Sequence, residues 1–143
     1  MAHLHRSRAS LRIFGDTLIP DEVSKMLGCN PTGSNFKGQA IPSKTRDIVK
    51  KTGYWSLDAA PCEPENLDAQ VAELLSKLTN DLSVWAALAR DYEIDLFCGF
   101  FMQTGDEGLD ISVMTLKSLA DRNIPLALCL YSNWDEIRSA PIV

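Results

Sequence analysis

Residues 94–131 constrain the fold of this chain more than any other stretch, because they predict a strand, a helix and a strand in succession. Residues 94–102 are apolar in both registers of a strand, and only Asp95 interrupts them. A strand with one face in water alternates apolar with polar side chains, so this pattern predicts a central strand covered on both faces. Residues 126–131 show the same pattern. Together they predict a βαβ unit.

The residues between these two strands predict a short helix. Ser112 can cap it, because a serine side chain accepts a hydrogen bond from a free N–H group of the first turn. Asn123 and Pro125 are typical of a helix end. The apolar side chains that recur at near-helical spacing are Val113, Leu116, Leu119 and Ala120.

The rest of the chain predicts two more strands and two more helical segments. Pro20 suits a first helical turn, and Gly28 suits the left-handed cap that ends the same helix. Asn66 can cap the strongest helical pattern, which residues 80–81 interrupt. The predicted strands are residues 9–15 and 54–57, and the helical segments are residues 20–28 and 66–92.

The predicted order β-α-β-α(α)-β-α-β favours an α+β fold of the ferredoxin-like sandwich type, with two split βαβ halves. Helices would cover one face of a mainly antiparallel four-stranded sheet. The alternative is a different α+β order with extra edge strands, for example at residues 109–111. Residues 9–143 are predicted to form a single domain. Residues 1–8 carry both histidines and no periodicity, which predicts a disordered leader.

Charge limits the partners that this chain can bind. The net charge is −5, but residues 31–53 hold five basic residues and one acidic residue, against nine and eighteen in the remainder. An acidic balance disfavours nucleic acid, while a basic loop can hold an anion. No apolar run approaches the roughly 20 residues of a membrane helix, and no signal peptide is visible. We expect a cytoplasmic monomer or homodimer that binds a protein partner or a small anionic ligand.

The residue types that carry catalysis are scarce. His3 and His5 are the only histidines, so a serine or cysteine nucleophile lacks a base within the predicted domain. Residues 33–40 have the glycine spacing of a phosphate loop without its Lys-Ser/Thr pair. The acids at 106, 107 and 110 lack calcium-loop spacing. No catalytic residue, metal or cofactor is predicted, and a hydrolase that uses only Asp and Glu has no paired-carboxylate motif to support it.

Four widely spaced cysteines form no Cys-x-x-Cys motif, which disfavours a zinc or redox site and fits a reducing compartment. Cys98 and Cys129 lie in the two most apolar strands. We expect both thiols to act as small apolar core groups.

The best candidate site is the loop of residues 29–52, because long loops without periodicity are usually functional or mobile. The predicted ligand contacts are Thr32, Lys37, Arg46 and Trp55. Trp55 has an alternative interpretation, in which it packs in the core and contacts no ligand, since aromatic side chains bury large areas.

Several short motifs resemble a bacterial family known as domain of unknown function 4279. They are Leu11-Arg-Ile-Phe-Gly15, Pro20-Asp-Glu-Val23, Leu27-Gly28-x-x-Pro31-Thr32 with Lys37-Gly38, Gly53-Tyr-Trp55-Ser-Leu57, the Leu-rich helix at 67–78 and the strand at 126–131. The resemblance spans residues 9–131. It implies a small intracellular α+β domain with no established activity, and it transfers no catalytic residue.

Two functions follow as hypotheses. The first is a non-enzymatic protein-interaction module, for example an immunity or antitoxin-like protein whose acidic face binds a basic toxin. The second is a small-molecule or anion-binding sensor domain that uses the 31–53 loop.

Overall fold

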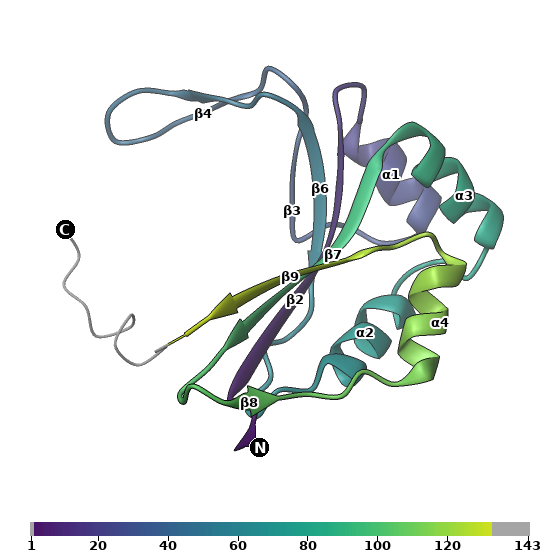
Figure 1. The fold of residues 1–143 in the computed structure, drawn as a ribbon. Helices are drawn as coiled ribbons and strands as arrows, with labels where there is room; N and C mark the ends of the chain where they lie inside the picture. The colour runs from purple at the N-terminus through teal and green to yellow at the C-terminus, as the bar shows by residue number, and fades with distance from the viewer. Residues whose placement is uncertain (1, 133–143) are drawn as a thin grey trace.

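A computed structural model describes residues 2–132 of the chain, as a sheet with four helices and several short strand pairs (Figure 1). The helices are α1 (Pro20–Leu27), α2 (Leu67–Ser76), α3 (Leu82–Asp91) and α4 (Val113–Asp121). The strands are β1 (Ala2–His3), β2 (Arg6–Gly15), β3 (Gly33–Asn35), β4 (Ala40–Ile41), β5 (Ile48–Val49), β6 (Gly53–Asp58), β7 (Glu93–Phe101), β8 (Glu107–Gly108) and β9 (Leu126–Tyr131).

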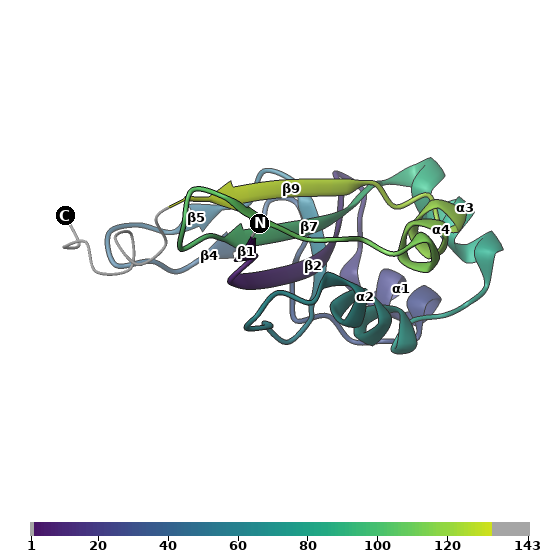
Figure 2. The same ribbon diagram turned by 60° about the horizontal axis from the view of Figure 1, so that its bottom comes forward.

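The main sheet has five strands in the order β3-β6-β2-β7-β9. Strand β2 lies at its centre and runs antiparallel to both β6 and β7, while β7 and β9 are parallel. The helices lie on one side of this sheet, so the described chain forms two layers (Figure 2). None of the four described helices lies on the opposite face of the sheet.

The core lies between the sheet and the helices, because alternate residues of each strand point toward them. From β2 these are Ala9, Leu11 and Ile13, each at most 2% exposed. Leu11 pairs in register with Leu57 of β6 and Leu96 of β7, and both partners are also buried. The apolar sides of three neighbouring strands thus form one continuous surface for the helices.

The predicted helix boundaries are confirmed by their capping contacts. Gly28 takes the left-handed conformation, with φ of 75°, directly after α1. The side chain of Asn66 accepts a hydrogen bond from Ala69 N at the start of α2. Ser112 does the same for α4 through the N–H of Thr115. The helical pattern of residues 66–92 breaks into α2 and α3 where residues 80–81 interrupt it.

The α+β class and the mainly antiparallel sheet are confirmed, but the strand order differs from two split βαβ halves. The two strands joined by α4, β7 and β9, are direct parallel neighbours with no strand between them. Strands β2 and β6 are antiparallel neighbours, and Gly53 at the start of β6 pairs with Gly15 at the end of β2. The segment between Gly15 and Gly53 begins and ends at the same end of the sheet. Strand β6 therefore runs back along β2 in the opposite direction.

The predicted leader is wrong for the described residues of the first eight. Strand β2 already begins at Arg6, and β1 pairs with β8 through His3 and Gly108. Leu4 is only 1% exposed and joins the core. The alternation of buried and exposed side chains along β2 extends into this segment, because Arg8 is exposed between the buried Ser7 and Ala9. Residue 1, and residues 133–143 of the predicted domain, lie outside the described residues.

The predicted loop of residues 29–52 also contains regular structure. Strand β3 pairs with β6 and adds an edge strand that the sequence pattern does not reveal. Strands β4 and β5 form a hairpin that projects from the sheet (Figure 1). These strands are only two or three residues long, too short for a readable alternation. The edge strand suggested at residues 109–111 is absent, and β8 lies just before it.

The prediction that residues 94–102 and 126–131 are covered on both faces holds only at the end of β7, where Gly99 and Phe101, which point away from the helices, are also buried. Helices cover β7 on one side only, and β9 is an edge strand on which Leu128 and Leu130 are 52% and 61% exposed. Cys98 is buried as predicted, and this burial raises the pKa of its thiol to about 12. Cys129 is only half-buried.

Candidate functional site

Trp55, one of the predicted ligand contacts, belongs to the core. It lies on the helix side of β6, is 0% exposed, and donates a hydrogen bond from Nε1 to Ser24 Oγ of α1 at 3.0 Å. Both its apolar ring and its polar nitrogen are therefore satisfied inside the protein. The structure supports the packing interpretation for this residue.

The other three predicted contacts lie at separate places. Thr32 Oγ1 accepts a hydrogen bond from Asp58 N at 2.9 Å, beside the end of β6. Lys37 forms an exposed ion pair with Asp16 at 3.0 Å, and this contact lowers the pKa of Asp16. Arg46 lies in the turn of the β4–β5 hairpin. A ligand site made by these residues and Trp55 stays a prediction.

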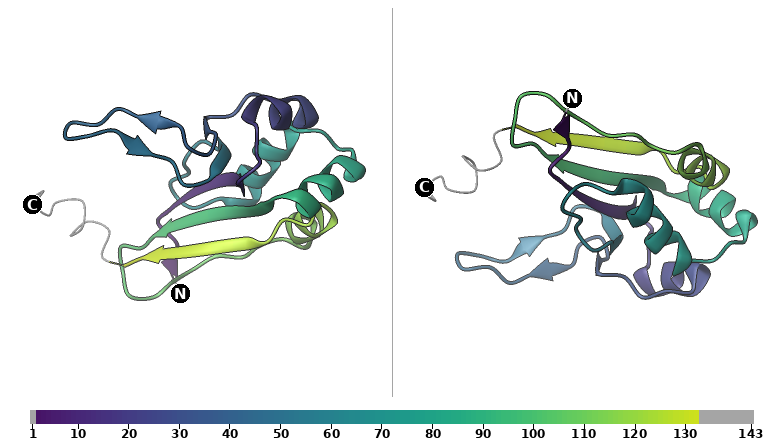
Figure 3. Two further views of the ribbon diagram at one scale, coloured as in Figure 1. Left: turned by 90° about the horizontal axis from the view of Figure 1, so that it is seen from above. Right: turned by 90° about the horizontal axis from the view of Figure 1, so that it is seen from below.

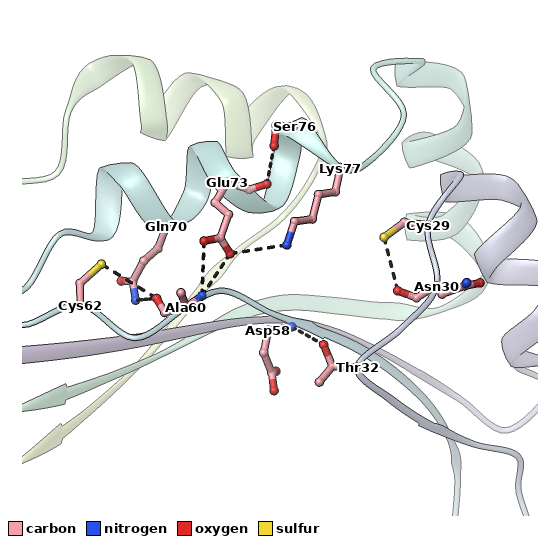
Figure 4. A network of polar contacts seen from close by, with 10 residues as sticks. All are labelled: Cys29, Asn30, Thr32, Asp58, Ala60, Cys62, Gln70, Glu73, Ser76 and Lys77. Atoms are coloured by element: carbon pink, nitrogen blue, oxygen red, sulfur yellow. Dashed lines mark hydrogen bonds and ion pairs between the residues drawn. The ribbon is translucent and has the colours of Figure 1, made fainter.

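The uncovered face of the sheet gathers aromatic and arginine side chains, which we call the open face. Register and strand alternation place there the residues of β2, β6, β7 and β9 that point away from the helices. In Figure 4 the side chain of Asp58 points to this side, away from α2. The set is Arg6, Arg8, Ser10, Arg12, Phe14, Tyr54, Ser56, Asp58, Glu93, Asp95, Phe97, Gly99, Phe101, Ala127, Cys129 and Tyr131.

Arg12 holds the middle of the open face in a fixed arrangement. Its guanidinium donates two hydrogen bonds to the Asp95 carboxylate, at 2.8 and 2.6 Å. The same group lies 4.5 Å from the ring centroid of Phe97 and 5.2 Å from that of Phe14. The hydrogen bonds to Asp95 raise the pKa of Arg12. Arg12 is thus occupied by its neighbours and orients two rings.

A hollow of about 280 Å³ opens on this face around Gly99. Phe101 and Tyr131 form one wall as a stacked pair, with ring centroids 4.8 Å apart and planes at 9°. Across the strand pairing, Arg8 lies directly opposite Gly99 and Ser10 opposite Phe97. The remaining lining residues are Ala9, Asp58 and Ala59.

Arg8 and Gly99 were not among the residues predicted from the sequence. The signal was a glycine inside an otherwise apolar strand, a position that often marks close approach of a ligand or another chain. The alternation of Arg6, Arg8 and Arg12 in one register was the second signal. It was obscured because the first eight residues were assigned to a leader.

A buried polar network ties the segment between β6 and α2 to β2, and Figure 4 shows the part of it in which Gln70 and Glu73 of α2 bond Ala60. Gln70 Nε2 donates to the backbone oxygens of Ser7 and Ala60, both at 3.0 Å, and Gln70 Oε1 accepts from Ser7 Oγ at 2.7 Å. Gln70 is 1% exposed and Ser7 0%. Near it, Ala60 N donates to the Glu73 carboxylate at 3.1 Å. The buried polar groups of Gln70 and Ser7 thus have partners within the protein.

Replacing Gln70 with leucine is expected to lower the free energy of unfolding by about 2 kcal/mol, because the Ser7 and Ala60 carbonyl oxygens each lose a donor and the Ser7 hydroxyl loses its acceptor. Urea denaturation checks this value. Adding Ser7→Ala to the variant should cost less than the sum of the two single changes, since the two side chains share a hydrogen bond. Additive effects would contradict the network.

A second hollow, of about 620 Å³, lies at the end of β2, and most of the charged residues that line it are acidic. Asp16, Asp91 and Glu93 line it, together with Arg90. Within residues 2–132, no group of three or more His, Cys, Asp or Glu side chains is placed to hold a metal ion. None of the described helices has the length and apolar character needed to cross a membrane.

These features define a two-layer α+β domain with a five-stranded, mostly antiparallel sheet, one face of which carries none of the described helices. The chain belongs to the family described as Domain of unknown function (DUF4279), whose family model matches residues 4–133. This confirms the resemblance seen in the sequence. The match begins at Leu4, the first residue of the core. No curated protein and no solved structure matches the chain.

Proposed function

We propose that this protein is a non-enzymatic interaction module that binds a protein partner along the outer edge of β9. The observation that carries the proposal is an apolar edge strand that no other segment within residues 2–132 covers. Strand β9, Leu-Ala-Leu-Cys-Leu-Tyr, contains no charged residue and no proline. Natural proteins usually protect such an edge with lysine, proline, a bulge or a covering segment, because its free N–H and C=O groups pair readily with another chain.

The backbone of β9 is available for such pairing. Among the described residues, β7 is its only partner strand, and the one further bond to its backbone runs from Met102 N, directly after β7, to the Tyr131 carbonyl oxygen. The helices gather at the end where β9 begins, and its second half extends beyond them (Figure 3). Leu128 and Leu130, which point to the helix side, are therefore exposed there.

The partner best suited to this edge supplies an extended segment with apolar residues at alternate positions. Main-chain hydrogen bonds would extend the sheet by one strand, and the apolar side chains would cover Leu128 and Leu130. The opposite edge is less suitable, because β3 has only three residues. An immunity or antitoxin-like role in the cytoplasm is one biological form of this proposal, in which the acidic chain binds a basic toxin.

Replacing Leu130 with lysine tests the interface. The immobilised full chain is exposed to an extract of the cells that carry its gene, and the retained partner is purified and its affinity measured. We expect Leu130→Lys to weaken partner binding by about tenfold or more, since a buried apolar contact is lost and a charge is placed in the interface.

The matched control is Val49→Lys in the β4–β5 hairpin, because Val49 and Leu130 are both 61% exposed on strands. The control should bind the partner as the wild type does. A partner retained equally by both variants would overturn the edge interface. A wild type that runs as a dimer in light scattering, and becomes monomeric with Leu130→Lys, would assign the edge to a second copy instead.

A further inference from the structure

The hollow around Gly99 is built by the absence of a side chain in the middle of the open face. Gly99 lies near the C-terminal end of β7, between Phe97 and Phe101 along the strand and between Arg8 and Cys129 across it. Every direct neighbour carries a side chain. Gly99 is one of the residues that line a hollow of about 280 Å³.

The fold itself does not require glycine at this position. Its φ does not lie in the left-handed region, since among described glycines only Gly28 and Gly38 have positive φ. A Cβ added to Gly99 would meet Phe101 and Tyr131 at 3.6 Å, which is ordinary van der Waals contact. Glycine also weakens a strand interior. The position is therefore explained better by the space that it leaves than by backbone geometry.

The walls of the hollow are aromatic and rigid. The stacked Phe101–Tyr131 pair stands on one side, and Arg6 lies over the Phe101 ring at 5.6 Å from its centroid. Phe97 stands on the other side and is held by Arg12. Flat rings favour offset-stacked or edge-to-face contact with another ring. A cavity of about 150 Å³ accommodates benzene, so this hollow has room for one or two fused rings with a substituent.

Charge at the hollow favours an anion on the side of Arg8. Arg8 is exposed, and its side chain has no hydrogen bond or ion pair with another residue in the part of the chain that the structure describes. The negative group at the hollow, Asp58, lies on the far side of β2 and accepts a hydrogen bond from Ser10 Oγ at 2.6 Å. A guanidinium binds a carboxylate with two parallel hydrogen bonds.

We propose that the open face binds a small aromatic carboxylate, with its ring over Gly99 between Phe97 and the Phe101–Tyr131 pair and its carboxylate on Arg8. This site is separate from the β9 edge, because Leu130 points to the helix side of the sheet and Gly99 to the open face. It goes beyond the proposed function and does not depend on it.

Titration of the full chain with indole-3-acetate and with benzoate tests the site. Calorimetry and amide NMR shifts monitor the binding. We expect saturable one-to-one binding, with a dissociation constant of about 1 mM or tighter, and shifts centred on Arg8 and Gly99. Cyclohexanecarboxylate, which has the charge without the aromatic ring, should bind at least about fivefold more weakly. No saturable binding of either aromatic acid would overturn the proposal.

Three variants locate the bound ligand. Gly99→Leu fills the hollow and should weaken binding by about tenfold or more, whereas Gly99→Ala fits and should weaken it less. Arg8→Gln should weaken binding by about tenfold to a hundredfold, because the charge-assisted hydrogen bonds are lost. Both Arg8→Gln and Gly99→Ala are changes that the fold accommodates, so they keep the test valid if Gly99→Leu unfolds the chain.

Arg46→Gln is the matched control, because Arg46 is an exposed arginine in the hairpin turn. It should leave the affinity unchanged. If Arg46→Gln abolished binding and Arg8→Gln did not, the ligand would belong to the 31–53 loop and the open-face site would be wrong. Leu130→Lys should also leave ligand binding unchanged. The ligand site on the open face and the protein interface at the β9 edge can therefore be disproved independently of each other.

Discussion

Replacing Trp55 with alanine is expected to lower the free energy of unfolding by about 4 kcal/mol, the largest loss that we anticipate for a single side chain. The indole is 0% exposed, packs in the core between β6 and the helices, and donates its N–H to Ser24. Alanine would leave a cavity and an unpaired hydroxyl. Urea denaturation followed by circular dichroism measures the loss.

The conservative variant Trp55→Phe separates the two interpretations of this residue. It keeps most of the apolar volume, so the loss should fall to roughly 1–2 kcal/mol. Binding of an aromatic carboxylate should stay unchanged, because the ring faces the core and not the open face. A Trp55→Phe protein of wild-type stability that no longer binds the ligand would assign Trp55 to a binding site instead.

Replacing Gly53 with alanine is expected to lower the free energy of unfolding by about 3 kcal/mol. A Cβ at this position would lie 2.5 Å from the Gly15 carbonyl oxygen, and 2.9 Å from both Cβ and the carbonyl oxygen of Leu18. Two of these three atoms belong to the backbone, so rotating a side chain cannot relieve the contact. The end of β2 and the start of β6 would have to separate.

Gly105→Ala is the control for that experiment. A Cβ there meets no atom within 4 Å, and its φ is not positive. We expect a change within about 0.5 kcal/mol, as for ordinary surface substitutions. A Gly53→Ala protein that unfolds at the same urea concentration as Gly105→Ala would show that β2 and β6 approach less closely than described here.

Strand β9 can carry two separate surfaces because its side chains alternate. Tyr131 points to the open face and forms the wall of the Gly99 hollow, whereas Leu130 points to the helix side and remains exposed. The main-chain edge lies between them. A partner strand on this edge would lengthen the open face beside the hollow without covering Gly99.

Local sequence patterns predicted the helices well. Their ends depend on residues next to each other in the chain, such as Gly28 after α1 and the caps Asn66 and Ser112. A cap bonds an N–H group two or three residues away, so its chemistry is visible in a short window. Family membership was visible for the same reason, because it rests on short motifs in a fixed order.

The candidate site was harder to predict, because its residues meet only across strands. Arg8 lies opposite Gly99 through a strand pairing that joins segments about 90 residues apart. The pattern of β7 was interpreted as a strand covered on both faces. In the structure, the apolar side chains on its open face cover one another and are covered by arginine stems, so no second layer of helices is needed.

The sequence by itself determined the α+β class, the helix ends and the membership of the family, because each follows from short-range periodicity, capping and motif order. Only the tertiary structure decided which strands are neighbours, that β9 is an edge, and that the glycine of β7 opens a hollow beside an arginine. Those features depend on pairing between distant segments, and the free energy of that pairing comes from the whole sheet and its helices, not from any local stretch.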